Sequence, residues 1–300
     1  MSLNEKNSEL EQLVATYEGD SDDAEVVHEK DERNGVAGTS LAIISTIMGG
    51  GIVSIPFAYS VAGPAIGASI QLTVILAIGV SCVLYLKTRD ILRCNTTFSV
   101  IANLCLGPIS GIILNLLLVF AVFGIMALYM ILFSEIAISL VGSTQDGDSF
   151  LCHKAFYVIA LCLLISPILV RKRIQELKVS TYVLFFGVIC LIVLLTSLLL
   201  INGSYAERIE QSGATIPVVI KKPLIMEDIM DSVNISVASQ GFVIALFPIY
   251  SSMARNARPR VMTSITGALL FTMGTYTFLS MVSISYFGQD NIKPSIFENI

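Results

Sequence analysis

Residues 39–63 read TSLAIISTIMGGGIVSIPFAYSVAG, and this stretch decides the fold. It is apolar over a length that suits a bilayer core of about 30 Å, which a helix of roughly 20 residues can span. Three consecutive glycines, Gly49 to Gly51, stand at its middle, and Pro56 follows them. Each glycine costs about 1 kcal/mol relative to alanine inside a helix. The stretch therefore predicts a membrane helix over 39–62 that is interrupted at its centre.

The rest of the chain repeats this apolar pattern. It is 54% hydrophobic and only 14% charged, whereas a soluble domain has about 25% charged residues. Gly63-Pro64 and Gly107-Pro108 mark the starts of the next two spans, because proline fits the first turn of a helix. We predict an all-α, polytopic membrane protein with about seven transmembrane helices. After the first, their predicted ranges are 65–86, 109–141, 155–170, 179–201, 233–253 and 261–287.

The first 34 residues differ from the rest, because they are polar, acidic and nearly free of bulky apolar side chains. Such a segment cannot bury enough apolar surface to fold. We therefore predict a disordered acidic tail over 1–34 and a transmembrane domain over 35–300. The six cysteines lack metal-ligand spacing, and the chain has neither a phosphate loop nor a zinc-protease motif. We predict no enzyme activity, no metal or other cofactor and no nucleic-acid partner.

Lys and Arg are distributed unequally between the two sets of loops. The loops after the second, fourth and sixth spans hold ten of them, and the opposite loops hold five. Loops rich in Lys and Arg stay in the cytosol. The amino terminus is therefore predicted to be cytosolic. This orientation argues against the main alternative, a seven-span receptor, which needs an outer amino terminus; a non-transporting membrane regulator is the related alternative.

The sixth span contains a second interruption. Residues 235–253 read ISVASQGFVIALFPIYSSM, in which Gln240-Gly241 and then Pro248 interrupt an apolar helix. Backbone groups freed in a membrane must line a cavity or be buried in protein, and a half-helix amino end can hold a carboxylate. Two interrupted helices in corresponding positions point to a midplane binding site. The alternative is that the glycines only permit close helix packing.

Three residues just before the glycines are candidates for binding an ion. Ser45 and Thr46 offer hydroxyls to an ion or a substrate amine, or they donate back to helix carbonyls. Met48 is included with them as an ion-binding candidate. Glu135 is the only charged side chain inside a predicted span, so it is either functional or solvated near the interface.

Three segments resemble the amino acid/auxin permease superfamily, in particular its sodium-coupled neutral amino acid transporter branch. They are IMGGGIVSIPFAYSVAG at 47–63, TFSVIANLCLG at 97–107 and FPIYSSMARNARPRVM at 247–262. The resemblance covers about residues 35–300. It implies a LeuT-like fold of two inverted five-helix repeats, about eleven spans in all, and amino-acid transport by alternating access. A chain with seven spans would then be a truncated record or isoform that is not expected to transport alone.

The resemblance also implies residue roles. The backbone of Gly49, Gly50, Gly51 and Ile52 would receive the substrate carboxylate, and Gln240, Gly241 and Phe242 would face the substrate side chain. Ser45 stands where that branch has an asparagine, so Na⁺ and H⁺ both stay open as the coupling ion.

We therefore predict an ion-coupled secondary transporter, a symporter of neutral amino acids. It would lie in the plasma membrane or the lysosomal or vacuolar membrane, with the bilayer and the substrate as its partners. The oligomeric state stays open.

Overall fold

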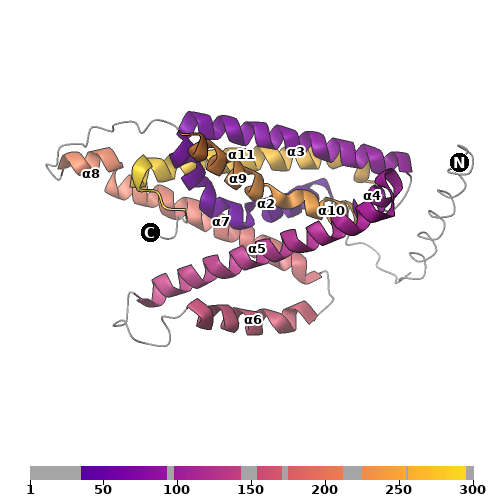
Figure 1. Ribbon diagram of the computed structural model, residues 1–300. Helices are drawn as coiled ribbons and strands as arrows, with labels where there is room; N and C mark the ends of the chain where they lie inside the picture. The colour runs from indigo at the N-terminus through magenta and orange to yellow at the C-terminus, as the bar shows by residue number, and fades with distance from the viewer. Residues whose placement is uncertain are drawn as a thin grey trace, which may run out of the picture.

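The computed structural model describes residues 35–92, 98–142, 154–170, 175–211, 225–254 and 256–294. Every regular element in these ranges is a helix (Figure 1). The predicted tail, 1–34, lies outside the described residues. The long helices are α2 (Val36–Ala62), α3 (Pro64–Leu92), α5 (Pro108–Gly142), α6 (Lys154–Val170), α7 (Gln175–Asn202), α9 (Met226–Ser239) and α11 (Val261–Phe287). The short ones are α4 (Phe98–Leu106), α8 (Tyr205–Gln211), α10 (Leu246–Ser251) and the 3₁₀ turns η2 (Gly241–Ala245), η3 (Arg258–Arg260) and η4 (Gln289–Asn291).

The two glycine–proline pairs divide the helices as predicted. Gly63 and Gly107 have φ angles of 89° and 95°, in a region that glycine enters without steric cost. Pro64 and Pro108 are the first residues of α3 and α5, where the missing backbone N–H has no helical partner to lose. The segment that joins α3 to α5 also forms a short helix, α4, which lies outside the predicted helix ranges.

Five helical spans in the described residues are long and apolar enough to cross a membrane, and the bent helix α2 makes a sixth. The predicted fourth span, 155–170, falls within α6, whose apolar described part is shorter than a membrane requires. The structure therefore supports a multi-pass membrane protein with five or six spans by length and composition.

Helix α2 lies at the centre of the bundle (Figure 1). Helices α3, α7, α9 and α11 pack against it, and its side chains are a large part of the buried core, among them Ile43, Met48, Ile55 and Tyr59. Helices α5 and α6 pack on each other to one side of this bundle (Figure 1). The most apolar 18-residue stretch of α5 has no buried residue. The helix with the glycines is therefore the one most enclosed by protein.

The sixth span is broken where the sequence predicted. Helix α9 ends at Ser239, five residues of 3₁₀ helix follow from Gly241, and α10 restarts at Leu246. Pro248 falls in the first turn of α10, where its missing N–H costs nothing. Helix α9 begins at Met226, seven residues before the predicted start of this span at 233. Acidic residues in its first turn, Glu227 and Asp228, favour a helix start because they complement the helix dipole.

Helix α2 is bent at its glycines. The segments Val36–Gly49 and Gly51–Ala62 meet at an angle of 59°, and sharp kinks are typical of glycine and proline sites. The residues across the bend nevertheless keep helical geometry from Val36 to Ala62. The predicted interruption is therefore present in the form of a bend within a continuous helix.

Candidate functional site

The two interruptions lie against each other. A Cβ atom placed on Gly51 would stand 2.5 Å from the Cβ and 2.9 Å from the Cα of Ser239, the last residue of α9. Ordinary van der Waals contact begins at about 3.4 Å. Only glycine therefore lets α2 approach the end of α9 this closely. The bend of α2 and the break of the sixth span form a single site, and in this conformation they are in direct contact at Gly51 and Ser239.

Tyr276 of α11 completes this contact. Its hydroxyl donates a hydrogen bond of 2.9 Å to the backbone carbonyl of Ile47, one turn before the bend. The same hydroxyl lies 2.7 Å from the position of a Cβ on Gly51, and the side chain is fully buried. A carbonyl in an apolar interior needs such a donor, because an unpaired one costs about 1–3 kcal/mol. Tyr276 therefore supports the backbone at the bend from a third helix.

The other predicted residues of α2 line the same bend. Gly49 faces the hydroxyl of Tyr129 on α5, which occupies the place where a Cβ would lie. Ile52 is buried at 5% exposure. Gly50 is the residue at which the two segments of α2 meet. All four residues predicted to receive a carboxylate are thus at the bend, where α2, α5, α9 and α11 come together.

The three predicted residues of the sixth span differ in their surroundings. Gln240 is 1% exposed, and neither amide atom has a hydrogen-bond partner within the described ranges. Phe242 is fully buried, and its N–H donates to the carbonyl of Gln240 over 2.8 Å. Gly241 is exposed, and a Cβ there would meet no atom within 4 Å. The break therefore places one buried amide with unused hydrogen-bonding capacity beside the bend of α2.

A row of serines on α9 was missed by sequence reasoning. Ser232, Ser236 and Ser239 are buried, and their spacing puts them on one helix face. Ser239 touches α2, so this face points toward α2. The hydroxyls of Ser232 and Ser236 have no partner in the described part of the chain, and the same holds for the amide of the fully buried Gln71 on α3. The serine spacing was a usable signal, whereas nothing in the sequence identified Tyr276 or Gln71.

The predicted ion-binding residues lie on the half of α2 that precedes the bend. Ser45 and Thr46 both donate to the carbonyl of Ala42, over 2.9 Å and 2.8 Å. This is the back-bonding alternative, in which both hydroxyls act as donors to the helix backbone. Met48 is fully buried. Glu135 is half-buried and lies on a different helix, α5.

Tyr59 and Tyr250 make two further contacts between helices. Tyr59 is fully buried and its hydroxyl pairs with that of Thr277 at 3.1 Å, which joins α2 to α11. The ring of Tyr250 on α10 contacts two guanidinium groups, whose Cζ atoms lie 4.0 Å (Arg89) and 5.4 Å (Arg258) from the ring centroid. The loops after the second and sixth spans therefore meet at one end of the bundle, which we call the basic end. This grouping agrees with the loop charges that set the predicted orientation.

These features define a multi-pass helical membrane protein with two opposed helix interruptions at its centre. The family model described as transmembrane amino acid transporter protein matches residues 32–300. Because the match covers most of the chain, the protein belongs to this family, whose members are transporters and not enzymes. Comparison with curated proteins and with solved structures finds no match.

Proposed function

We propose that this protein is a secondary active symporter of neutral amino acids that works by alternating access around α2 and the α9–η2–α10 segment. It would have the LeuT-like inverted-repeat arrangement with seven spans in this chain, α6 being the fourth. The observation that carries the proposal is the contact between Gly51 and Ser239. Two helix interruptions that meet in the bundle centre are typical of a substrate site between repeats.

The chemistry of the site suits a zwitterionic substrate. The substrate carboxylate would bind at the backbone of Gly49 to Ile52, and the unpartnered amide of Gln240 would supply a hydrogen bond nearby. Phe242 offers an apolar surface to an uncharged side chain. Because α2 and α9 touch at Gly51, they would have to separate before substrate enters. The structure then corresponds to a closed state of the site.

The coupling ion would bind at Ser45, Thr46 and the Met48 backbone. Hydroxyl and carbonyl oxygens are ligands for a hard cation such as Na⁺, whereas H⁺ requires a titratable acceptor. Within the described parts of α2, α5, α9, η2, α10 and α11, the carboxylates are Glu135 on α5 and Glu227, Asp228 and Asp231 near the start of α9, and none of them is on α2. This composition favours Na⁺ at the α2 site, in the plasma membrane or in a lysosomal or vacuolar membrane.

Substrate protection at the second break tests the proposal. Gly241→Cys, in a background with the six native cysteines replaced, adds a side chain where the structure has free space. We expect a thiol reagent to modify Cys at this position and a neutral amino acid to slow the reaction severalfold, while an acidic or basic amino acid does not. The proposal would be overturned if no amino acid changed the rate of thiol modification and the protein also took up no labelled neutral amino acid. Gly187→Cys on α7, an exposed position with equal free space, is the control.

A further inference from the structure

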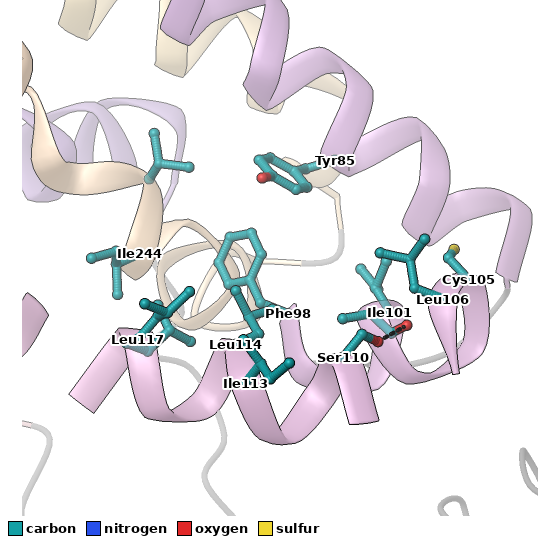
Figure 2. Close-up of a pocket in the computed structure, with 13 residues that line it drawn as sticks. Tyr85, Phe98, Ile101, Cys105, Leu106, Ser110, Ile113, Leu114, Leu117 and Ile244 are labelled. Atoms are coloured by element: carbon teal, nitrogen blue, oxygen red, sulfur yellow. Dashed lines mark hydrogen bonds between the residues drawn. The ribbon is translucent and has the colours of Figure 1, made fainter. Parts of the chain in front are cut away.

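An apolar pocket lies near the basic end and is separate from the α2 bend. It has a volume of about 520 Å³, which is in the range of small-molecule sites. The walls come from α3, α4, α5 and η2, and the ring of Phe98 stands among the lining side chains (Figure 2). Tyr85 contacts this ring edge-on at 4.9 Å. On the α5 side, Leu117 is more than half exposed, so the pocket opens on the outer surface of the helices.

The pocket offers a hydrocarbon surface and few polar groups. Ser110 is one of its polar lining residues, and its hydroxyl donates to the carbonyl of Ala102 (Figure 2). The same hydroxyl also donates to the carbonyl of Gly107 between α4 and α5. A charged amino acid would lose its hydration in such a pocket without gaining partners. An alkyl chain has no charged group to dehydrate, so it can enter the pocket without this cost. The pocket therefore suits a different ligand from the one proposed for the α2 bend.

Cations lie next to the pocket at the basic end. Arg89 follows Tyr85 by four residues on α3, which places the two side chains on one helix face. Phe98 packs against Phe247 of α10 at 4.3 Å, and the next turn of α10 carries Tyr250, held between Arg89 and Arg258. The described parts of α3, α4, α5, α10, η2 and η3 carry four cations, Lys87, Arg89, Arg258 and Arg260, and two carboxylates, Asp90 and, far along α5 from the lining residues, Glu135.

We propose that this pocket and the adjacent arginines bind an anionic phospholipid, with an acyl chain in the pocket and the phosphate at the arginines. The Nε of Arg258 has no hydrogen-bond acceptor in the described part of the chain, and the residue as a whole is partly exposed, so its guanidinium keeps hydrogen-bonding capacity for a phosphate oxygen. Clusters of Lys and Arg at the cytosolic surface attract anionic lipids, and the basic end is the one predicted to face the cytosol. A zwitterionic lipid would use the pocket without needing the cations, and a soluble anion would use the cations without the pocket.

The chain has no tryptophan, so one introduced tryptophan gives a site-specific fluorescence signal. Leu117→Trp places it at the pocket, and Phe120→Trp, on an exposed position of the same helix outside the pocket, is the matched control. The purified full chain is placed in bilayers containing brominated phosphatidylserine or brominated phosphatidylcholine at the same mole fraction. We expect the phosphatidylserine to quench at a lower mole fraction than phosphatidylcholine at position 117 but not at 120. The expected preference is about fivefold for each contributing arginine.

Charge variants separate the two parts of the site. In the Leu117→Trp protein, Arg258→Gln is expected to lower the preference for phosphatidylserine about fivefold. Arg208→Gln is the control, because Arg208 makes a similar ring contact with Tyr286 at the opposite end of the bundle. Inorganic phosphate should not displace the lipid. Equal quenching by the two lipids, or a preference that Arg258→Gln leaves unchanged, would overturn the proposal; Ile113→Trp repeats the test if Leu117→Trp does not fold.

Discussion

Replacing Gly51 by alanine tests the contact on which the proposed site depends. The added methyl group would stand 2.5 Å from the Cβ of Ser239 and 2.7 Å from the Tyr276 hydroxyl, so α2 and α9 would have to move apart by about 1 Å to reach van der Waals distance. Overpacking of this kind costs about 1–3 kcal/mol. Alanine recovers about 1 kcal/mol through its better helix propensity, which partly offsets the loss.

The closed state carries this cost, because the open state separates the two helices. A penalty of 1–3 kcal/mol on one of two states shifts their ratio by about 5- to 150-fold. We therefore expect Gly51→Ala to reduce the uptake of labelled neutral amino acid by about tenfold or more, at normal expression and with thermal unfolding of the detergent-purified protein changed only slightly.

Gly187→Ala is the matched control, because it adds the same methyl group on the exposed face of α7, where nothing lies within 4 Å. Its uptake should stay within about twofold of the parent protein, given that surface substitutions usually change stability by no more than 0.5 kcal/mol. Equal uptake by the two variants would refute the reasoning. That result would mean that the contact between Gly51 and Ser239 is not part of the transport cycle.

Three further predictions concern other parts of the structure. Tyr276→Phe removes the donor to the Ile47 carbonyl and should lower the stability by about 1–3 kcal/mol, measured as a reduced midpoint of thermal unfolding in detergent; an unchanged midpoint would contradict the role given to this hydroxyl. Tyr250→Leu removes the ring that Arg89 and Arg258 contact and should lower the free energy of unfolding by about 0.5–2 kcal/mol. Tyr250→Phe keeps a ring and should retain most of this stability. Equal losses of stability in the two variants would exclude a ring–cation contribution. An epitope at the amino terminus should be reached by antibody only after the cells are permeabilised, and staining of intact cells would favour the receptor topology.

The positions of the helices could be predicted from the sequence because their boundaries depend on local chemistry. Pro64, Pro108 and the Gln240-Gly241 pair each act within one helical turn, and each interrupts the chain where expected. The start of α9 was placed too late because its first turn is polar, and hydropathy does not register Glu227 and Asp228 as helical residues.

The arrangement of the site could be predicted only in part. That two interruptions face each other follows from the paired breaks, but the direct contact of Gly51 with Ser239 depends on how α2 and α9 cross. The interruption at Gly49 to Gly51 takes the form of a bend that side chains of other helices contact, and the sequence gives no measure of how far such a stretch opens. Tyr276 is separated from Ile47 by 229 residues in the sequence, so no local pattern could pair them.

Helix α5 is held in place by the surrounding bilayer as much as by contacts with other helices. Its central stretch is unburied, and Tyr129 is the residue through which it reaches Gly49 of α2. A bilayer of fixed thickness restrains the tilt of such a helix, whereas a detergent micelle adapts to it. Purification in short-chain detergent is therefore expected to loosen α5 and free the bend from its tyrosine while the five-helix core remains folded.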